Sequence, residues 1–295
     1  MSVLSSARAG TEPPPSTADE PGRLTVVPAR HPWRWIGAAA VLVLVAQFTH
    51  GLITNPGWDW GTFAGYFFEE SVMRALLVTL ELTFAGAVLG FLGGIVLAPM
   101  RLSHNPVLRA VSWTYIWVFR SVPLIVQLLF WANLGYLYDK LQIGVPFGPG
   151  FAGFETAHLV SSFGAALLGL ALHEAAYAAE IVRAGIISVD QRQLEAAAAL
   201  GIPRLRQFRR ILLPQAMRAI LPSAANELVN LLKSTSVVYV LAIGELFYQV
   251  QVVYGRNGRV VPLLMVATVW YVVLTAVLSV FQHYVERHFS RGWRR

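Results

Sequence analysis

The side chains best suited to handle a polar ligand are ionisable residues that lie inside long apolar runs. Glu174, Tyr177 and Glu180 are spaced by three, so a helix would gather them within about a third of its circumference. A face with two carboxylates and a phenol suits a passage for a cationic or zwitterionic solute. The alternative is structural, with Glu180 paired to Arg183 one turn later and Arg120 neutralising a carboxylate on a neighbouring helix.

Two more polar residues, Asn230 and Lys233, fall on one side of a later apolar run together with Asn226. Placing a charge near the bilayer centre costs about 2.5–3.5 kcal/mol, so such residues are expected to face the protein interior or water. We therefore add Asn230 and Lys233, together with Arg120, to the candidate passage. Lys233 is alternatively a pairing residue, or one near a helix end that extends its ammonium group to water.

The sequence lacks three motifs that would indicate nucleotide binding, metal binding or catalysis by the chain itself. No Gly-x-x-x-x-Gly-Lys-Ser/Thr phosphate loop, no histidine pair at metal spacing and no Gly-x-Ser-x-Gly sequence occurs. There is also no cysteine, which excludes disulfides and thiol nucleophiles. We expect no enzymatic activity, no metal site and no cofactor, and any ATP would have to be bound by a partner subunit.

The elements that position these residues are expected to be membrane-spanning helices. Of 295 residues, 56% are hydrophobic and only 13% are charged, and the apolar residues gather in runs long enough to cross a bilayer. The sequence therefore predicts an all-α, polytopic helix bundle of about six spans. The runs lie near 35–53, 72–99, 109–136, 160–183, 219–249 and 261–283.

The basic residues are distributed as membrane topology requires. Of the 23 Lys and Arg residues, 17 fall in alternate connections if the N-terminus is cytoplasmic, which predicts that both termini face the cytoplasm. The net charge of +7 does not indicate nucleic acid, because no basic stripe is interleaved with aromatic residues. The 17 are Arg8, Arg23, Arg30, Arg34, Arg101, Arg109, Arg183, Arg192, Arg204, Arg206, Arg209, Arg210, Arg218, Arg287, Arg291, Arg294 and Arg295.

The remaining segments divide the chain into four expected parts. A Pro- and Ser-rich N-terminus is expected to be a disordered cytoplasmic tail, because it lacks an apolar period. The external loop at 138–158 is long and rich in Gly and Pro, and is either a docking surface for an external partner or a structured cap. The parts are 1–34 (tail), 35–71 (first span and external segment), 72–287 (transmembrane domain) and 288–295 (basic cytoplasmic tail).

Three glycines recur every four residues in the second apolar run. Gly86, Gly90 and Gly94 would form a smooth stripe on one helix face. Such a stripe allows the backbone of a neighbouring helix to approach closely. We interpret it as a packing surface.

The connection at 186–218 is too polar and too rich in arginine to lie in lipid, yet it is patterned as helix. Ser188 with Gln191 matches a Ser-x-x-Gln capping arrangement, and Gly201 stands where a left-handed C-terminal residue is expected. Pro203 suits the first turn of a second, amphipathic helix. The alanine-rich first helix has a smooth surface that can enter a groove, which predicts a docking element.

This loop resembles the signature loop of ABC-importer permeases, in which it grips the ATP-hydrolysing subunit. The resemblance rests on EAAAALG at 195–201 followed by ILLPQA at 211–216, in an inside connection before the penultimate span. It implies the type I ABC-importer permease fold with a cytoplasmic coupling helix. The coupling residues that it implies are Glu195, Ala196, Ala197, Gly201, Phe208, Leu213 and Pro214.

Further segments look like the polar amino acid branch of these permeases, the histidine, glutamine and arginine type. They are TLELT at 79–83, RLSHNPVLR at 101–109, FRSVPLIVQL at 119–128, AAYAAEIVRAG at 175–185 and LKSTS at 232–236. The chain departs from the expected pattern at Ser121, Val122 and Glu174, and these departures bear on the substrate rather than on the class.

The resemblance implies a permease subunit that moves a small polar amino acid across a bacterial cytoplasmic membrane. The implied partners are an ABC ATPase subunit, an extracytoplasmic solute-binding protein, a second identical or similar permease and membrane lipid. The alternative is an ion-coupled carrier or channel for small polar solutes, which would explain the buried charges but leave the EAAAALG loop without a task.

Overall fold

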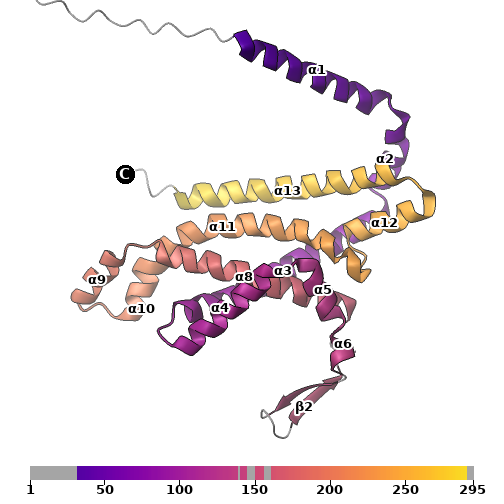
Figure 1. Cartoon of the computed structure of the whole chain (residues 1–295). Coiled ribbons are helices and arrows are strands. Elements are labelled where there is room, and N and C mark those ends of the chain that lie inside the picture. The colour runs from indigo at the N-terminus through magenta and orange to yellow at the C-terminus, as the bar shows by residue number, and fades with distance from the viewer. Residues whose placement is uncertain (1–31, 139, 145–149, 156–160, 291–295) are drawn as a thin grey trace, which may run out of the picture. The chain divides into compact units, whose positions relative to one another are not determined.

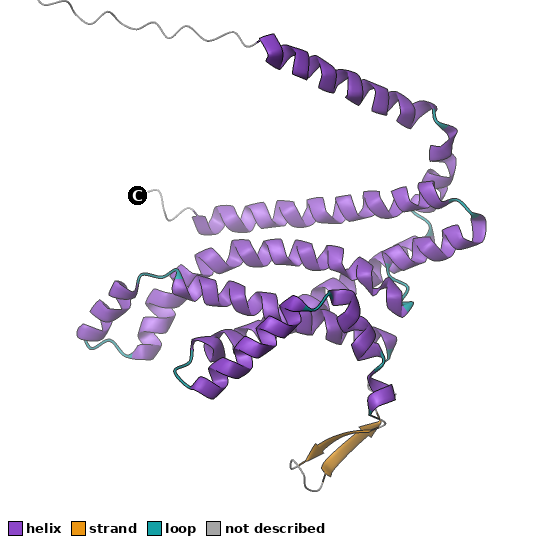
Figure 2. Ribbon diagram, in the orientation of Figure 1, coloured by secondary structure: helices purple, strands orange, loops and turns teal. Residues whose placement is uncertain are grey.

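The computed structural model describes residues 32–138, 140–144, 150–155 and 161–290 (Figures 1 and 2). Most of the tail expected at 1–34 and of the basic segment expected at 288–295 lies outside these residues. The chain divides into two compact units, Met1–Asn55 and Pro56–Arg295, which are described separately.

The first unit contributes one helix, α1 (Pro32–Thr54), which covers the first expected span. It is apolar on all sides and, within the described residues, its side chains are almost entirely exposed. Its polar hydroxyls bond within the helix, since Thr49 Oγ1 donates to Val45 O and Thr54 Oγ1 donates to His50 O, each at 2.8 Å. A helix that is apolar all round suits a lipid environment.

The second unit is a bundle of helices with one small hairpin. Its elements in chain order are η1 (Pro56–Trp58), α2 (Trp60–Phe67), α3 (Glu70–Leu102), α4 (Pro106–Ser121), α5 (Leu124–Ala132), α6 (Leu134–Leu137), β1 (Lys140–Gly144), β2 (Gly150–Glu155), α8 (Ser162–Ile187), α9 (Gln191–Ala199), α10 (Arg204–Gln207), η2 (Phe208–Leu212), α11 (Leu213–Ser234), η3 (Thr235–Leu241), α12 (Leu246–Asn257) and α13 (Val260–Ser290). Among the described residues, four helices are long and apolar enough to cross a membrane: α1, α3, α8 and α13.

Two further spans are bent pairs, which brings the number of spans to the expected six when each pair counts as one. The span expected near 109–136 is broken rather than continuous, because α4 and α5 meet at an angle of 104°. Pro123 explains this break, since it lacks an N–H donor and disfavours helical geometry at Val122. Val122 is accordingly extended, with φ −87° and ψ 130°.

The span expected over 219–249 is also broken, with a bend of 47° before α12. Ala242 takes a left-handed φ of 55° there, and Glu245 caps α12 by accepting the N–H groups of Phe247 and Tyr248 at 2.9 and 2.6 Å. The hydroxyl of Tyr271 from α13 donates to the same carboxylate at 3.2 Å. The fully buried Glu245 therefore satisfies the helix start that the break exposes.

The most extensive helix contact is between α3 and α8, and it runs along the glycine stripe predicted from the sequence. A Cβ on Gly94 would lie 2.5 Å from Cβ of Ala178 and 2.7 Å from N of Ala179. A Cβ on Gly90 would lie 2.4 Å from Cγ of Glu174. The stripe is thus a packing surface, which confirms the interpretation.

Apolar side chains form a central core and a second core toward one end. The central core joins Leu82, Leu128, Leu170 and Leu231, which come from α3, α5, α8 and α11. The second core contains Val72, Leu246, Val250, Leu263, Val266 and Ala267, with aromatic residues of α2 packed against it. Each bent span is therefore fixed in place by apolar contacts with straight spans.

Part of the long loop at 138–158 forms an antiparallel hairpin of β1 and β2, with Lys140 opposite Glu155. The sequence did not predict these strands. They lie outside the helix bundle (Figure 2), so the all-α description holds for the membrane-spanning body.

Three connections lie at the same end of the second unit, on the left in Figure 1. They are the turn between α3 and α4, the α9–α10 loop and the C-terminal end of α13. The hairpin and the turn between α12 and α13 lie toward the other end. This arrangement is the one expected from the distribution of arginines.

Candidate functional site: a docking loop and an adjoining polar pocket

The helix α9 is closed at both ends by specific hydrogen bonds. Asp190 begins it, since its side chain accepts the N–H of Arg192 at 3.0 Å. The expectation that Ser188 is this cap is wrong: Ser188 ends α8, where its hydroxyl donates to Gly185 O at 2.8 Å. Asp190 directly precedes the first residue of α9. Ser and Asp are both good N-cap residues, so residue type alone does not identify which of the two caps the helix.

At the other end of α9, Gly201 has a φ of 71°, which confirms the left-handed residue predicted there. The N–H of Gly201 donates to Ala198 O at 2.9 Å, and the N–H of Ile202 donates to Ala197 O at 3.0 Å. These bonds satisfy carbonyls that the end of the helix leaves free. The result is a tight turn that reverses the chain.

The loop is attached firmly to the helices that carry it. Val189 is buried with Ala216 and Ile220 of α11. The side-chain amide of Gln215 donates to Gln193 Oε1 of α9 at 2.7 Å, and that of Gln207 donates to Ile202 O at 2.7 Å. A displacement of α9 would therefore be transmitted to the ends of α8 and α11.

Three large apolar side chains are exposed on the outer surface of the loop, among its exposed arginines. Leu200 is 80% exposed, Leu205 is 62% exposed and Phe208 is 46% exposed. Of the coupling residues predicted from the sequence, Glu195, Ala196, Gly201, Leu213 and Pro214 are also exposed, whereas Ala197 is buried. Apart from the charged Glu195, the exposed coupling residues present small and apolar groups to a neighbouring molecule, whereas the buried Ala197 supports the fold of the loop.

The second helix of the loop continues into the fifth span without a break. Between α10 and α11 it widens into a π turn, in which the N–H of Leu213 donates to Phe208 O. Pro214 follows directly and has no N–H of its own to donate. A single π turn of this kind is frequent at functional sites in helices.

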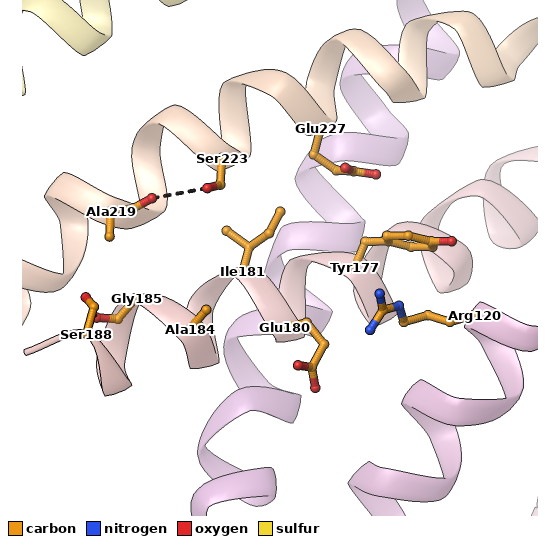
Figure 3. Close-up of a pocket in the computed structure, with 10 residues that line it drawn as sticks. All are labelled: Arg120, Tyr177, Glu180, Ile181, Ala184, Gly185, Ser188, Ala219, Ser223 and Glu227. Carbon is orange, nitrogen blue, oxygen red and sulfur yellow. Dashed lines mark hydrogen bonds between the residues drawn. The ribbon is translucent and has the colours of Figure 1, made fainter.

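Beside this loop lies a pocket of about 510 Å³ between α4, α8 and α11 (Figure 3). Its floor is mostly aliphatic, and its polar groups come from all three helices. The lining residues are Arg120, Tyr177, Glu180, Ile181, Ala184, Gly185, Ser188, Ala219, Ser223 and Glu227. It joins the membrane-spanning part of the bundle to the base of the docking loop, because Ser188 lies at the start of that loop.

One wall of the pocket is a cation–aromatic contact. The guanidinium carbon of Arg120 lies 5.1 Å from the ring centre of Tyr177, and Figure 3 shows Arg120 reaching across from α4 toward that ring. Tyr177 also contacts His173, with 4.9 Å between the two ring centres. Arg120 and Tyr177 are thus brought together, as the candidate passage required.

The position of Glu180 is compatible with both roles considered from the sequence. It lines the pocket, and its Oε2 accepts Arg183 Nη2 at 2.7 Å and Nε at 2.9 Å. The pairing with Arg183 is therefore confirmed. The carboxylate is only partly buried, so it remains accessible from the pocket side.

Glu174 does not line the pocket. It is 1% exposed and packs against Gly90 of α3, and its Oε1 has no hydrogen-bond partner among the described residues. The two carboxylates that share a helix face in the sequence therefore have different surroundings, because α3 covers one and leaves the other open. In this structure Glu174 is therefore not placed to contact a ligand in the pocket.

Asn230 and Lys233 also lie outside the pocket, although both are exposed on α11. Asn230 Nδ2 donates to Oε2 of Glu227 at 3.3 Å, so it supports a lining residue. The sequence analysis did not assign Glu227 or Ser223 to the passage. Their spacing of four on α11 was a usable signal, but only the packing of α11 against α8 shows which face meets the pocket.

A bundle of straight and broken spans with a protruding helix between its fourth and fifth spans is the fold of ABC-importer permeases. Residues 90–291 match the family described as "Binding-protein-dependent transport system inner membrane component". The chain belongs to this family, and it is a multi-pass membrane component of an ABC transporter.

Two relatives show how far the similarity extends along the chain. The "Arginine transport system permease protein ArgU" of Corynebacterium glutamicum is 42% identical over 290 residues, which cover 96% of this chain and 88% of the relative. The "Probable amino-acid permease protein YxeN" of Bacillus subtilis is 33% identical and covers 80% of this chain and 98% of its own length. The first alignment therefore includes the region of α1.

Solved structures confirm the fold. A chain of the "Crystal structure of an amino acid ABC transporter with histidines" has a TM-score of 0.62 and 32% identity, and the match covers 74% of this chain and 94% of that one. A chain of the MetNI methionine ABC transporter has a TM-score of 0.59 at 20% identity, over 75% of this chain and 97% of that one. The second match concerns the fold alone.

Proposed function

We propose that this permease moves a cationic amino acid, with arginine as the first candidate, into the bacterial cytoplasm. The observation that carries the proposal is the pocket between α4, α8 and α11, in which the carboxylates of Glu180 and Glu227 stand with Arg120 and Tyr177. The carboxylates suit a cationic side chain, and Arg120 suits the α-carboxylate common to all amino acids. The similarity to an arginine permease supports this choice.

We propose that energy enters through the docking loop. No phosphate loop occurs in the chain, so ATP is expected to be bound by a separate ATPase subunit that grips α9 and the exposed residues around it. The chain itself is then a transport subunit without catalysis or a cofactor. An extracytoplasmic binding protein and a second identical or similar permease complete the expected assembly, as the family description and the related transporters suggest.

The orientation follows from the same proposal, with both termini and the docking loop in the cytoplasm. Because the chain has no cysteine, single cysteines at Arg206 and Asn257 can be labelled without background. We expect a membrane-impermeant maleimide added to intact cells, or to spheroplasts if an outer barrier is present, to label position 257 but not position 206. Labelling of position 206 from outside, with position 257 protected, would indicate the opposite topology and contradict this proposal.

The alternative, an ion-coupled carrier or channel, gives no role to the docking loop. The loop is capped, closed by a left-handed glycine and attached through Gln193 and Gln215, yet it presents apolar side chains outward. Such a surface indicates a protein partner. We therefore favour the ATP-driven importer.

The proposed pocket is tested by Glu180→Gln, which removes a charge and keeps the shape. We expect KM for arginine uptake to rise about tenfold, the loss of one charge-assisted contact, with little change in the amount of protein in the membrane. Glu174→Gln should raise KM less, because that side chain is buried against α3 and does not line the pocket. The measurement is initial uptake of labelled arginine into proteoliposomes that contain the complete transporter.

Arg183→Gln is the matched control, since it breaks the same ion pair without altering a pocket residue. An equal rise in KM for Arg183→Gln and Glu180→Gln would show that the carboxylate of Glu180 has a structural role and does not bind the substrate. Competition by unlabelled histidine, glutamine and glutamate in the same assay ranks the substrates. Stronger competition by glutamate than by arginine itself would contradict a cationic substrate.

A further inference from the structure

The break between α4 and α5 leaves several carbonyl groups without helical partners. The last carbonyls of a helix have no N–H to accept, and Pro123 removes the donor that would serve Phe119 O. Arg120, which reaches into the pocket, lies one residue beyond Phe119. The position of its side chain therefore depends on how this helix end is held.

Gln127 of α5 reaches back to this helix end. Its Nε2 donates to Phe119 O at 2.9 Å and to Val122 O at 2.8 Å, so its two hydrogens go to carbonyls on either side of Arg120. If the amide were flipped, Oε1 of Gln127 would face these two carbonyl oxygens, and none of the three atoms could donate a hydrogen bond. The side chain is 5% exposed, which shields both bonds from water.

The same amide also lies against α8, which carries the other wall of the pocket. Nδ1 of His173 is 3.2 Å from Gln127 Nε2. The ring of His173 packs on Tyr177, over which the guanidinium of Arg120 lies. A closed circuit of contacts thus runs from the end of α4 through Gln127 and His173 to Tyr177 and back to Arg120.

We propose that Gln127 is a positioning residue that holds Arg120 at the substrate pocket by bonding the broken end of α4. This inference rests on the proposed role of the pocket. Gln127 itself does not line that pocket, so it acts through Arg120 rather than by touching the substrate. The unpartnered Oε1 of Gln127 fits this assignment, because the amide nitrogen alone makes the required contacts.

Gln127→Met tests the proposal, since methionine is also unbranched and of similar length but has no donor. We expect KM for arginine uptake to rise about tenfold or more, because a small displacement of a binding group is sufficient for such a loss. The maximal rate and the amount of protein in the membrane should stay nearly unchanged. The assay again uses permease, ATPase and binding protein together in proteoliposomes.

Leu128→Met is the matched control for packing. Leu128 is the next residue of α5 and fully buried, but its side chain makes no hydrogen bond. This exchange conserves volume closely, so KM should be unchanged. If Gln127→Met does not accumulate, Gln127→Glu replaces it, because a glutamate has the same shape and at most one donor.

A double-mutant cycle with Arg120→Gln decides whether the two residues act together. We expect Arg120→Gln alone to raise KM and the addition of Gln127→Met to raise it no further, since coupled residues are non-additive. An unchanged KM in Gln127→Met, or a full additional effect in the Arg120→Gln background, would overturn the positioning role. An unchanged KM in Arg120→Gln would instead contradict the proposed pocket.

Discussion

Gly201→Val is expected to abolish most ATP-driven uptake while the protein still inserts at normal levels. Gly201 has a φ of 71°, and a β-branched residue in that region costs about 1–3 kcal/mol. The strain would loosen the turn that ends α9. A Cβ there meets no atom of the chain within 4 Å, so the added bulk would project into the space of the partner. Membrane content by immunoblot and arginine uptake in proteoliposomes measure the two effects.

Gly201→Asn separates strain from bulk, because asparagine tolerates the left-handed conformation better than other side chains. If strain dominates, Gly201→Asn should retain much more uptake than Gly201→Val. If contact with the ATPase dominates, both should fall together. Full uptake in Gly201→Val would show that the loop does not need this turn to function.

Gly94→Val is expected to remove the folded transporter altogether. A Cβ at this position would lie within 3 Å of both Ala178 and the backbone nitrogen of Ala179, and backbone atoms cannot move aside as a flexible side chain can. Overpacking of a close contact costs about 1–3 kcal/mol or more. Here it would separate α3 from α8, the pair of helices with the most extensive contact. Size-exclusion profiles and thermal melting in detergent measure the loss.

Gly255→Val is the matched control for that substitution. Gly255 also lies in a helix, α12, but a Cβ there meets nothing within 4 Å. It should lose only a little stability, as expected for a β-branched residue in a helix. Equal losses in the two variants would mean that helix propensity, rather than the α3–α8 contact, explains the effect.

The spans and the docking loop could be predicted from sequence because their signals are local. Apolar runs identify helices of sufficient length, and Gly201 carries its own conformational preference. The break at Pro123 was missed because hydropathy averages across a proline that lies inside an apolar run. The hairpin of β1 and β2 was missed because the segment at 138–158 is rich in Gly and Pro, which is typical of a loop.

The pocket could be predicted only in part, since it depends on which helix faces meet. Tyr177 and Glu180 share a face of α8 and do line it, whereas Glu174 on the same face is covered by α3 at Gly90. Helical spacing alone cannot distinguish these neighbours. Ser223 and Glu227 were missed for the same reason, because their role depends on the packing of α11 against α8.

The central claim, that ATP hydrolysis drives transport through the docking loop, is tested most directly by measuring uptake and ATP hydrolysis in the same proteoliposomes. The comparison is wild type against Glu195→Lys, which reverses an exposed charge on α9 and leaves every span unaltered. We predict that wild-type uptake requires ATP and the ATPase subunit. We also predict that Glu195→Lys lowers uptake and substrate-stimulated hydrolysis together, with less ATPase co-purified. Wild-type uptake driven by an ion gradient without ATP, or full uptake and ATPase binding in Glu195→Lys, would contradict the account.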